Sequence, residues 1–350
     1  MINQVIQLVK PKTFEIKMQD IKLLNNSLII RPTYLSICHA DQRYYKGARD
    51  KAVLQQKLPM ALIHEAVGEV QYDPLKEFNY GEKVVMIPNI PGSFLGYEKS
   101  ISELNEKIGE NYCPNARFRS SGYDGFMQEL IAQPRELVIR AHDSIHEHLL
   151  SITELLSVCT HAFKRFQMYS HGFNDVIGVW GDGNIAFLMS LLLKKSLPNS
   201  KIIVFGKHSE KLEMFSFVDE TYLIHENIDA IKVHHFFECV GGEAQSGVLN
   251  KIIDIIQPGG TISALGVTEK KIELNVRMML EKGLVLVGDS RSGVNDFQSA
   301  MDFMKINRIG DYLSGLVTNT VTVSDIANVH HAFEIDSLKS FGKTVMKWDI

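Results

Sequence analysis

The pattern of hydrophobic and polar positions changes about halfway along the chain. In roughly the first 150 residues, short apolar stretches typical of strands are separated by Gly, Pro and Asn, and helical periodicity is weak. Strand-like examples are Ser27 to Ile30, Glu82 to Ile87 and Phe126 to Ile131. This half predicts an irregular β domain.

From about Asp175, strand-like and helix-like segments alternate. The predicted strands are Val176 to Trp180, Ile202 to Phe205, His235 to Cys239, Thr261 to Leu265 and Leu284 to Val287, and the predicted helices start at Asn184, Ser209 and Ala244. Such alternation indicates a parallel sheet with helices on both faces. The last part of the chain predicts a helix near Asn295 and a strand over Thr344 to Trp348, which could pack on either half.

The first strand of the alternating half runs into G-D-G-N-I-A, residues 181–186, which opens a helix. Gly181 allows a tight turn, Gly183 lets a pyrophosphate approach the backbone, and Ala186 allows close packing of helix on strand. Asn184 and Ile185 stand at the helix N-terminus, which favours phosphate. The motif also occurs in structural turns, but its place between a strand and a helix favours a dinucleotide site.

The second strand of this half ends in Gly206, Lys207 and His208. Proteins that bind the ribose 2′-hydroxyl of NAD place an acid here. No carboxylate is expected to repel a 2′-phosphate, and Lys207, with His208 or Lys211, could pair with one. The sequence therefore favours NADPH over NADH, the alternative being that Lys207 is a solvated lysine in a turn.

Composition narrows the class of protein. A chain of 350 residues suggests two domains, and 45% apolar with 22% charged residues is typical of globular proteins. The net charge of −4 argues against a nucleic-acid or polybasic membrane surface. The most apolar run, Ile185 to Leu193, is far short of the roughly 18 residues of a membrane span, and the N-terminus lacks signal-peptide features. The four cysteines form no C-x-x-C motif, so we expect a cytoplasmic protein without disulfides.

Candidate metal ligands lie in the first half. Cys38 stands in L-S-I-C-H-A-D-Q, and His64 and Glu65 stand in L-I-H-E-A-V-G-E-V. A thiolate, an imidazole and a carboxylate are each good zinc ligands, and a catalytic zinc uses about three. Taken singly, a Cys is more often a small core residue and a His-Glu pair more often a surface pair.

Taken together, the motifs resemble those of zinc-dependent medium-chain dehydrogenases. They are Cys38 followed by Asp41, H-E-x-x-G-E-V at 64–70, Y-D-G-F-M-Q-E at 123–129, Glu154 in E-L-L-S-V-C-T-H-A-F-K-R, the glycine-rich loop, E-C-V-G at 238–241, P-G-G at 258–260 and L-G-V at 265–267. Within that family the chain is similar to the TarJ-type ribulose-5-phosphate reductases. The narrower match lies in A-D-Q-R-Y-Y, Q-Q-K-L-P-M, F-R-S-S-G-Y-D-G-F-M-Q, W-G-D-G-N, I-V-F-G-K, F-E-C-V-G-G and S-R-S-G.

The resemblance implies an α/β fold, with a Rossmann doubly wound parallel sheet and a GroES-like irregular β-barrel. Residues 1–154 and 295–350 would form the catalytic domain and residues 155–294 the dinucleotide-binding domain, with the active site in the cleft between them. The implied zinc ligands are Cys38, His64, Glu65 and Glu154. Asp41 would orient a ligand, the alternative being an ordinary acid at a helix start. Cys239, Gly266 and Arg291 would join Gly206, Lys207 and the glycine-rich loop at the cofactor.

The implied reaction reduces D-ribulose 5-phosphate to D-ribitol 5-phosphate, which supplies CDP-ribitol for wall teichoic acid or capsule. Zinc would act as a Lewis acid on the ketone, and NADPH would supply the hydride. One thiolate and two carboxylates leave Zn²⁺ with a net charge of −1, which favours exchange of Glu65 or Glu154 during turnover. Relatives carry a Ser or Thr where this chain has Ala40, so His39, Tyr44 or a zinc-linked water remain as proton routes.

Two further features follow from the resemblance. The four-cysteine lobe that binds a structural zinc in many relatives is missing, because Cys113 is the only cysteine between residues 39 and 158, so one zinc per chain is expected. A sugar phosphate needs cations, and we assign Arg43 and Arg119 to its phosphate. They are taken from a group that also contains Lys46, Arg49, Arg117 and Arg291.

We also expect a homodimer and a cytidylyltransferase as the partner that takes the product. Two alternatives remain. One is a zinc polyol or alcohol dehydrogenase that acts on a non-phosphorylated substrate. The other is a non-catalytic NADPH-binding protein, against which the four ligand-type residues argue.

Overall fold

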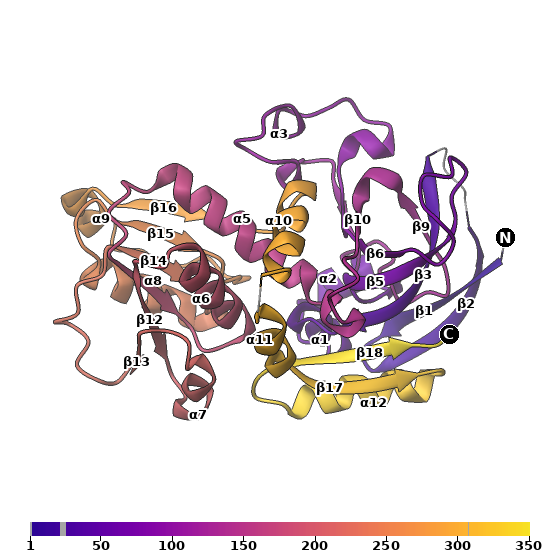
Figure 1. Ribbon diagram of the computed structural model, residues 1–350. Coiled ribbons are helices and arrows are strands. Elements are labelled where there is room, and N and C mark those ends of the chain that lie inside the picture. Colours follow the sequence, from indigo (N-terminus) through magenta and orange to yellow (C-terminus); the bar gives the residue numbers. More distant parts are fainter. Residues whose placement is uncertain (1, 22–25, 307) are drawn as a thin grey trace. The chain divides into compact units, whose positions relative to one another are not determined.

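The computed structural model describes residues 2–21, 26–306 and 308–350, and the chain divides into two compact units (Figure 1). The first contains Met1–Ser157 and Ser292–Ile350, and the second contains Val158–Arg291. Helix α5, Thr153–Tyr169, begins in the first unit and ends in the second. Among the described residues, no helix is both long and apolar enough to cross a membrane.

The second unit is built on one parallel sheet of six strands. The strands are β11 Val176–Trp180, β12 Lys201–Gly206, β13 Glu220–Leu223, β14 His235–Glu238, β15 Thr261–Ala264 and β16 Val285–Gly288. The helices are α6 Asn184–Ser196, α7 Ser209–Leu212, α8 Gln245–Ile255 and α9 Val276–Lys282, with 3-10 turns at Glu213–Phe215 and Gly242–Ala244. The strand order β13-β12-β11-β14-β15-β16 is that of a Rossmann fold.

The hydrophobic pattern explains this sheet. The side chains of Ile202 to Phe205 are almost fully buried, as expected for a parallel strand covered on both faces. The five predicted strands are confirmed to within a residue or two at their ends. Strand β13 and helix α9 were not predicted, and the helix predicted from Ser209 is only a single turn.

The first unit is mostly β. Its strands are β1 Ile2–Lys10, β2 Thr13–Asp20, β3 Ser27–Ser36, β4 Met60–Ala61, β5 Glu65–Tyr72, β6 Lys83–Met86, β7 Asn89–Ile90, β8 Arg117–Phe118, β9 Ile131–Pro134, β10 Val138–Arg140, β17 Val317–Val323 and β18 Lys343–Trp348. Its other helices are α1 His39–Tyr45, α2 Lys51–Lys57, α3 Ile101–Leu104, α4 Glu147–Leu150, α10 Val294–Met304, α11 Ile309–Leu316 and α12 Ile326–Leu338, and its 3-10 turns are Gly92–Leu95, Glu110–Tyr112 and Arg135–Leu137.

The C-terminal segment belongs to the first unit. Strand β18, yellow in Figure 1, pairs antiparallel with β3 and parallel with β17. Its Val345 is in register with Ser36 of β3, and Ser36 is in register with Glu65 of β5. The last residues of the chain therefore lie in the same sheet as a predicted metal ligand.

The strand predicted over Phe126 to Ile131 is wrong. Only Gln128 makes an isolated bridge there, and the strand β9 starts at Ile131. Two N–H groups of this segment bond to a loop, Phe126 N to Ile63 O at 2.8 Å and Met127 N to Leu62 O at 3.3 Å, while Met127 O accepts from Ile6 N of β1 at 2.9 Å. Its apolar side chains are buried in the core although its backbone is not part of a ladder.

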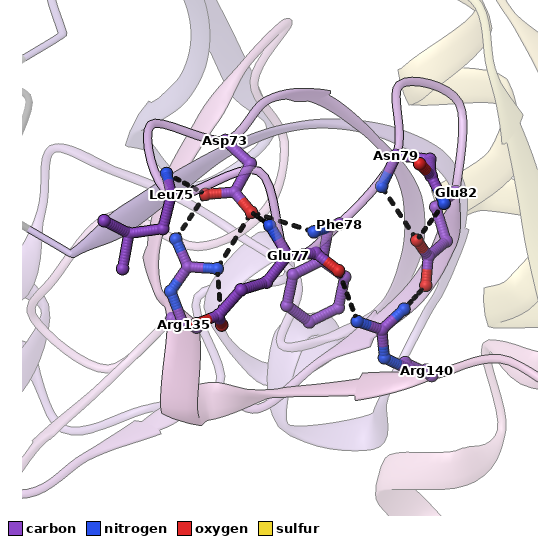
Figure 2. A network of polar contacts seen from close by, with 8 residues as sticks. All are labelled: Asp73, Leu75, Glu77, Phe78, Asn79, Glu82, Arg135 and Arg140. Atoms are coloured by element: carbon purple, nitrogen blue, oxygen red, sulfur yellow. Dashed lines mark hydrogen bonds and ion pairs between the residues drawn. The ribbon is translucent and has the colours of Figure 1, made fainter.

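A network of polar contacts stabilises the far end of β5, the strand that begins with Glu65 (Figure 2). Asp73 follows this strand, and its carboxylate accepts hydrogen bonds from the backbone N–H groups of Leu75, Glu77 and Phe78 at 2.7 to 2.9 Å. The Arg135 guanidinium also donates to Asp73. The Arg135 bonds lower the pKa of Asp73 against the opposing effect of burial.

We expect Asp73→Asn to reduce the free energy of unfolding by about 1.5 to 3 kcal/mol at pH 7, the scale of hydrogen bonds to a charged group. Because the pKa of Asp73 is lower in the folded protein than its unfolded value of about 4, the ionised carboxylate stabilises the folded state above about pH 4. This stabilisation is lost as the pH falls from there toward the folded-state pKa. The gap between wild type and variant should therefore close below about pH 4 in urea titrations.

The control for this prediction is Glu82→Gln, which removes another carboxylate of the same network. Glu82 pairs with Arg140, whose side chain is 54% exposed, so its loss should cost about 1 kcal/mol at most. Equal losses in the two variants would contradict the role assigned to Asp73.

Candidate active site

Three of the predicted zinc ligands come together in the first unit. One ligand atom each from Cys38, His64 and Glu65 lies within 4.8 Å of the others. Cys38 precedes α1, His64 precedes β5, and Glu65 is the first residue of β5. His64 and Glu65 are buried, whereas Cys38 is partly exposed. The cluster therefore has one accessible side, as a site that admits substrate requires.

Asp41 links the two segments that carry these ligands. Its carboxylate is fully buried and accepts hydrogen bonds from Cys38 N at 3.2 Å and from Ile63 N at 3.0 Å. Ser120 Oγ donates to the same carboxylate at 2.5 Å. Asp41 is thus both an acid in the first turn of α1 and a support for the loop before His64.

The carboxylate of Asp41 also faces the ring of His64, with Nδ1 at 3.6 Å. Burial opposes charge on His64, but Asp41 and the Cys38 thiol raise its pKa well above the usual value. Burial likewise opposes charge on Asp41, but His64 lowers its pKa. A carboxylate behind a ligand histidine fixes the ring orientation in many metal sites.

The residue before His64 has an unusual backbone. Ile63 has φ of 71°, a region that β-branched residues rarely adopt. Its N–H is held by Asp41 and its carbonyl by Phe126 N, and its side chain is completely buried. Such strain persists where the surroundings impose it, and here it sets the direction of the chain entering His64.

The motif at residues 123–129 supports the same loop. Asp124 accepts a hydrogen bond from Ala61 N at 2.7 Å, and Gly125 N donates to Ala61 O at 2.8 Å. A Cβ on Gly125 would lie 2.3 Å from the carbonyl oxygens of Leu62 and Ile63. Only glycine allows this approach, so the motif is needed to place the segment that carries two of the ligands.

Lys343 is a residue of this site that sequence reasoning missed. Its Nζ lies 2.7 Å from Glu65 Oε1, and both side chains are almost completely buried. Burial opposes its charge, but Glu65 and Cys38 raise its pKa, so it is a buried cation. The lysine that opens a C-terminal strand was the only available signal, and its partner is 278 positions away.

Glu65 has a second carboxylate oxygen with a different environment. Among the described residues, Oε2 is buried and has no hydrogen-bond partner. An orphaned buried carboxylate oxygen beside a thiol and an imidazole is a feature that a bound cation would satisfy. The donor set therefore fits a zinc ion on its own chemistry.

Glu154 lies outside the three-residue cluster but within its electrostatic reach. The residue is buried in the first turn of α5. Burial raises its pKa to about 7, opposed by the charges of His64 and Lys343 and assisted by those of Glu65 and Asp41. A carboxylate with this pKa can change its charge near neutral pH.

The predicted phosphate-binding cations separate into two groups. The first group lies around α1, close to the exposed His39, and consists of Arg43, Lys46 and Arg49. Burial lowers the pKa of His39, and the positive charges of these three residues lower it further. The Arg49 guanidinium lies 4.8 Å from the ring centroid of Tyr44, which is itself buried. Of the two residues named as proton-relay candidates, His39 is exposed and Tyr44 is buried.

The assignment of Arg119 to the substrate phosphate is wrong. Its side chain is buried, and its guanidinium donates to Gln133 Oε1, Asp124 O and Ala132 O at 2.9 to 3.2 Å. Its donors are engaged by the fold, and it stabilises the motif at residues 123–129. Arg117, on β8, is exposed, and its guanidinium lies over the ring of Tyr123, as does that of Arg119.

The glycine-rich loop has the geometry predicted for it, within the second unit. Gly181 has φ of 138°, and a Cβ there would meet those of Cys239 and Ala186 at 3.3 and 3.4 Å. A Cβ on Gly183 would meet nothing within 4 Å, so the space in front of it is open. Gly183 also caps α6, whose first residues are Asn184 and Ile185. The loop thus presents backbone N–H groups at an accessible helix N-terminus.

The loop after β12 differs from the prediction in one respect. A carboxylate does stand there, because Asp182 Oδ2 accepts hydrogen bonds from Lys207 N and His208 N at 2.8 and 2.9 Å. It comes from the glycine-rich loop and not from the end of the strand. A Cβ on Gly206 would meet Leu212 at 2.6 Å and Asp182 at 3.0 Å, so a larger residue at the end of β12 would require Leu212 to move.

Glu238 lies next to two of the remaining cofactor candidates, since it precedes Cys239 in the chain and contacts Gly266. Its buried carboxylate accepts hydrogen bonds from Val240 N and Gly241 N, and from Gly266 N and the Gln245 amide. Cys239 follows it, and burial raises the pKa of that thiol. Arg291 ends the second unit with φ of 60°, and burial lowers its pKa. Sequence reasoning used Glu238 only as part of a motif and missed this role.

Comparison with known proteins agrees with these features. The model of the alcohol dehydrogenase GroES-like domain matches residues 25–143. The chain is 44% identical to a ribulose-5-phosphate reductase of Bacillus spizizenii over 351 aligned residues, covering 100% of both proteins. It is 45% identical to ribulose-5-phosphate reductase 1 of Staphylococcus aureus, covering 99% of both. The chain belongs to the ribulose-5-phosphate reductase family. The resemblance noted from the motifs is thereby confirmed.

A solved structure extends the comparison to the fold. The crystal structure of S. aureus TarJ in complex with NADPH superposes with a TM-score of 0.86 at 41% identity, and the match covers 100% of both chains. The predicted combination of a Rossmann sheet and a GroES-like domain is therefore confirmed. As a member of this reductase family, the chain is an enzyme.

Proposed function

We propose that this enzyme reduces D-ribulose 5-phosphate to D-ribitol 5-phosphate with NADPH, using a zinc ion bound by Cys38, His64 and Glu65. The observation that carries the proposal is the cluster of Cys38, His64 and Glu65 in a chain 44 to 45% identical to ribulose-5-phosphate reductases along its whole length. Glu154 is the proposed fourth ligand or exchangeable carboxylate. The first unit would be the catalytic domain and the second the cofactor domain.

When bound, zinc supplies a Lewis acid for the ketone oxygen, and NADPH supplies the hydride. The chain's own residues orient these groups. Asp41 faces the His64 ring at 3.6 Å and accepts a hydrogen bond from Ile63 N, and Lys343 donates to one oxygen of Glu65. The product alcohol also needs a proton, and the exposed His39, beside Cys38, is the proposed relay.

In the second unit, we propose that Gly181, Gly183 and Ala186 shape the pyrophosphate site. Asn184 and Ile185 would offer the N-terminus of α6, and Lys207 would pair with the 2′-phosphate. Gly206, Cys239, Gly266 and Arg291 complete the proposed cofactor site.

The biological setting belongs to the proposal as well. The expected enzyme is a cytoplasmic homodimer whose product is taken by a cytidylyltransferase, leading to CDP-ribitol for wall teichoic acid or capsule. The identity of 44 to 45% to ribulose-5-phosphate reductases supports the reaction, and the resemblance of the sequence motifs to that family implies this setting.

We expect the substrate phosphate to decide specificity. A site that pairs a dianion leaves cations unpaired when the phosphate is missing, so kcat/KM for ribulose should lie about two or more orders of magnitude below that for ribulose 5-phosphate. Arg43→Ala should lower kcat/KM for ribulose 5-phosphate by about tenfold or more and leave that for ribulose nearly unchanged. NADPH oxidation across a panel of ketoses and ketose phosphates measures both effects.

Arg31→Ala is the matched control, because Arg31 is an exposed arginine on β3 that pairs with Glu69. It removes the same charge from the same unit away from α1. If ribulose or fructose is reduced as well as ribulose 5-phosphate, the enzyme is a general polyol dehydrogenase.

A further inference from the structure

We propose that Asp182 is a positioning residue that makes the second unit select a 2′-phosphorylated cofactor. The inference rests on the proposed NADPH dependence and adds the residue that shapes its specificity. Asp182 occupies the second position of the glycine-rich motif, between Gly181 and Gly183. It reaches across to the loop after β12, which contains the lysine proposed to bind the 2′-phosphate.

The contacts of Asp182 fix that loop. One carboxylate oxygen, Oδ2, accepts from Lys207 N at 2.8 Å, His208 N at 2.9 Å and His208 Nδ1 at 2.9 Å. Two consecutive backbone N–H groups and an imidazole thus converge on a single atom. This arrangement sets the backbone from which the side chains of Lys207 and His208 project.

The negative charge of Asp182 is directed into the protein. Its side chain is only 14% exposed, and it faces the two N–H dipoles and the imidazole. Burial opposes ionisation, but His208, the two N–H groups and the charge of Lys211 lower the pKa of Asp182, so it is a carboxylate at neutral pH. Its partners compensate this charge, which would otherwise repel a phosphate.

Asp182 also restricts what can stand at the end of β12. A Cβ at Gly206 would lie 2.6 Å from Leu212 Cδ2 and 3.0 Å from Asp182 Cβ, so Leu212 would have to move and Asp182 would be crowded. The place from which an acid would bind a ribose 2′-hydroxyl is therefore crowded by both residues. Asp182 supports the basic loop and, together with Leu212, disfavours an acid at this position.

The test is the ratio of dissociation constants for NADH and NADPH, measured by fluorescence titration of the full-length chain. Asp182→Ala should raise the Kd for NADPH by about tenfold and that for NADH by less than about threefold. Asp182→Asn keeps an oxygen that can accept from both N–H groups, so its ratio should lie between those of Asp182→Ala and wild type. The pair 2′,5′-ADP and 5′-ADP repeats the comparison without the nicotinamide.

Asp219→Asn is the matched control. Asp219 accepts a backbone N–H of β12, from Ile202 at 2.7 Å, at the end of the strand opposite to the loop that Asp182 contacts. Its loss should leave the ratio unchanged. Retained NADH binding shows that each variant is folded.

The outcomes separate the two levels of the proposal. If wild type binds NADH as tightly as NADPH, the proposed cofactor is overturned and the inference with it. If wild type prefers NADPH and Asp182→Ala keeps the full preference, only the inference is overturned. A higher preference in Asp182→Asn than in wild type would mean that the carboxylate opposes the 2′-phosphate, which also overturns it.

Discussion

Replacing Lys343 by methionine is expected to lower the free energy of unfolding of the first unit by about 3 to 5 kcal/mol when metal is removed by a chelator. The substitution leaves Glu65 as a buried carboxylate without a cation, whereas wild type pairs them at 2.7 Å. Zinc binds only the folded site, and at about 100 times its Kd it adds about 2.7 kcal/mol to the folded state. Since zinc would also give Glu65 a positive partner, the difference between wild type and variant should shrink when zinc replaces the chelator.

The measurement is urea unfolding followed by tryptophan fluorescence. The chain has two tryptophans, and a Trp180→Phe background leaves Trp348 of the first unit as the sole reporter. Lys347→Met is the matched control, because Lys347 lies exposed on the same strand. Adding Glu65→Gln to Lys343→Met should recover part of the lost stability, since no charge then remains unpaired. A Lys343→Met protein as stable as the control in chelator would show that the ion pair does not support the site.

Features formed by residues close together in the sequence were predictable, whereas contacts between residues far apart in the sequence were not. The glycine-rich loop was predictable because strand, turn and helix occupy one short stretch, and each glycine has a local reason. The ion pair of Lys343 with Glu65 joins residues 278 positions apart, and nothing local to either residue indicates the other.

Arg119 shows a different limit. Composition and position correctly identified a cation near the motif at residues 123–129, but not the direction of its side chain. Alternation along a strand would place Arg117 and Arg119 on the same face, but β8 ends at Phe118, and here Arg117 is exposed while Arg119 is buried. The guanidinium bonds to Gln133 and to backbone carbonyls, which only the folded chain brings to it.

Strand periodicity also had limits. The stretch Phe126 to Met127 is as apolar as a strand, but its N–H groups bond to the loop before His64 and only its one bridge, at Gln128, reaches β1, so a buried segment here forms no strand. Strand β17 went unpredicted because it is an edge strand with half-exposed and exposed residues in alternation. The carboxylate of Asp182 was not predicted at the end of β12 because it comes from the glycine-rich loop, 25 positions before Lys207 in the chain.

Replacing Cys38 by serine is expected to abolish zinc binding and reductase activity while the protein stays folded. Wild type should contain about one zinc per chain, and the variant close to none, because a serine hydroxyl is a much weaker zinc ligand than a thiolate. Elemental analysis and NADPH oxidation with ribulose 5-phosphate measure the two effects.

The local structure makes this substitution informative. Cys38 is the residue that precedes α1, and its backbone N–H bonds to Asp41. Serine is a preferred residue at a helix start, so the variant should keep α1 and the Asp41 contacts, and a loss of activity is not explained by unfolding. The control is Cys113→Ser, since the Cys113 thiol is buried, donates to Glu103 Oε2 at 3.1 Å and accepts from Gly92 N at 3.3 Å, bonds that a hydroxyl can also make. That variant should keep its zinc and its activity, because the expected metal is at Cys38. Retention of zinc and activity by Cys38→Ser would remove the thiolate from the mechanism.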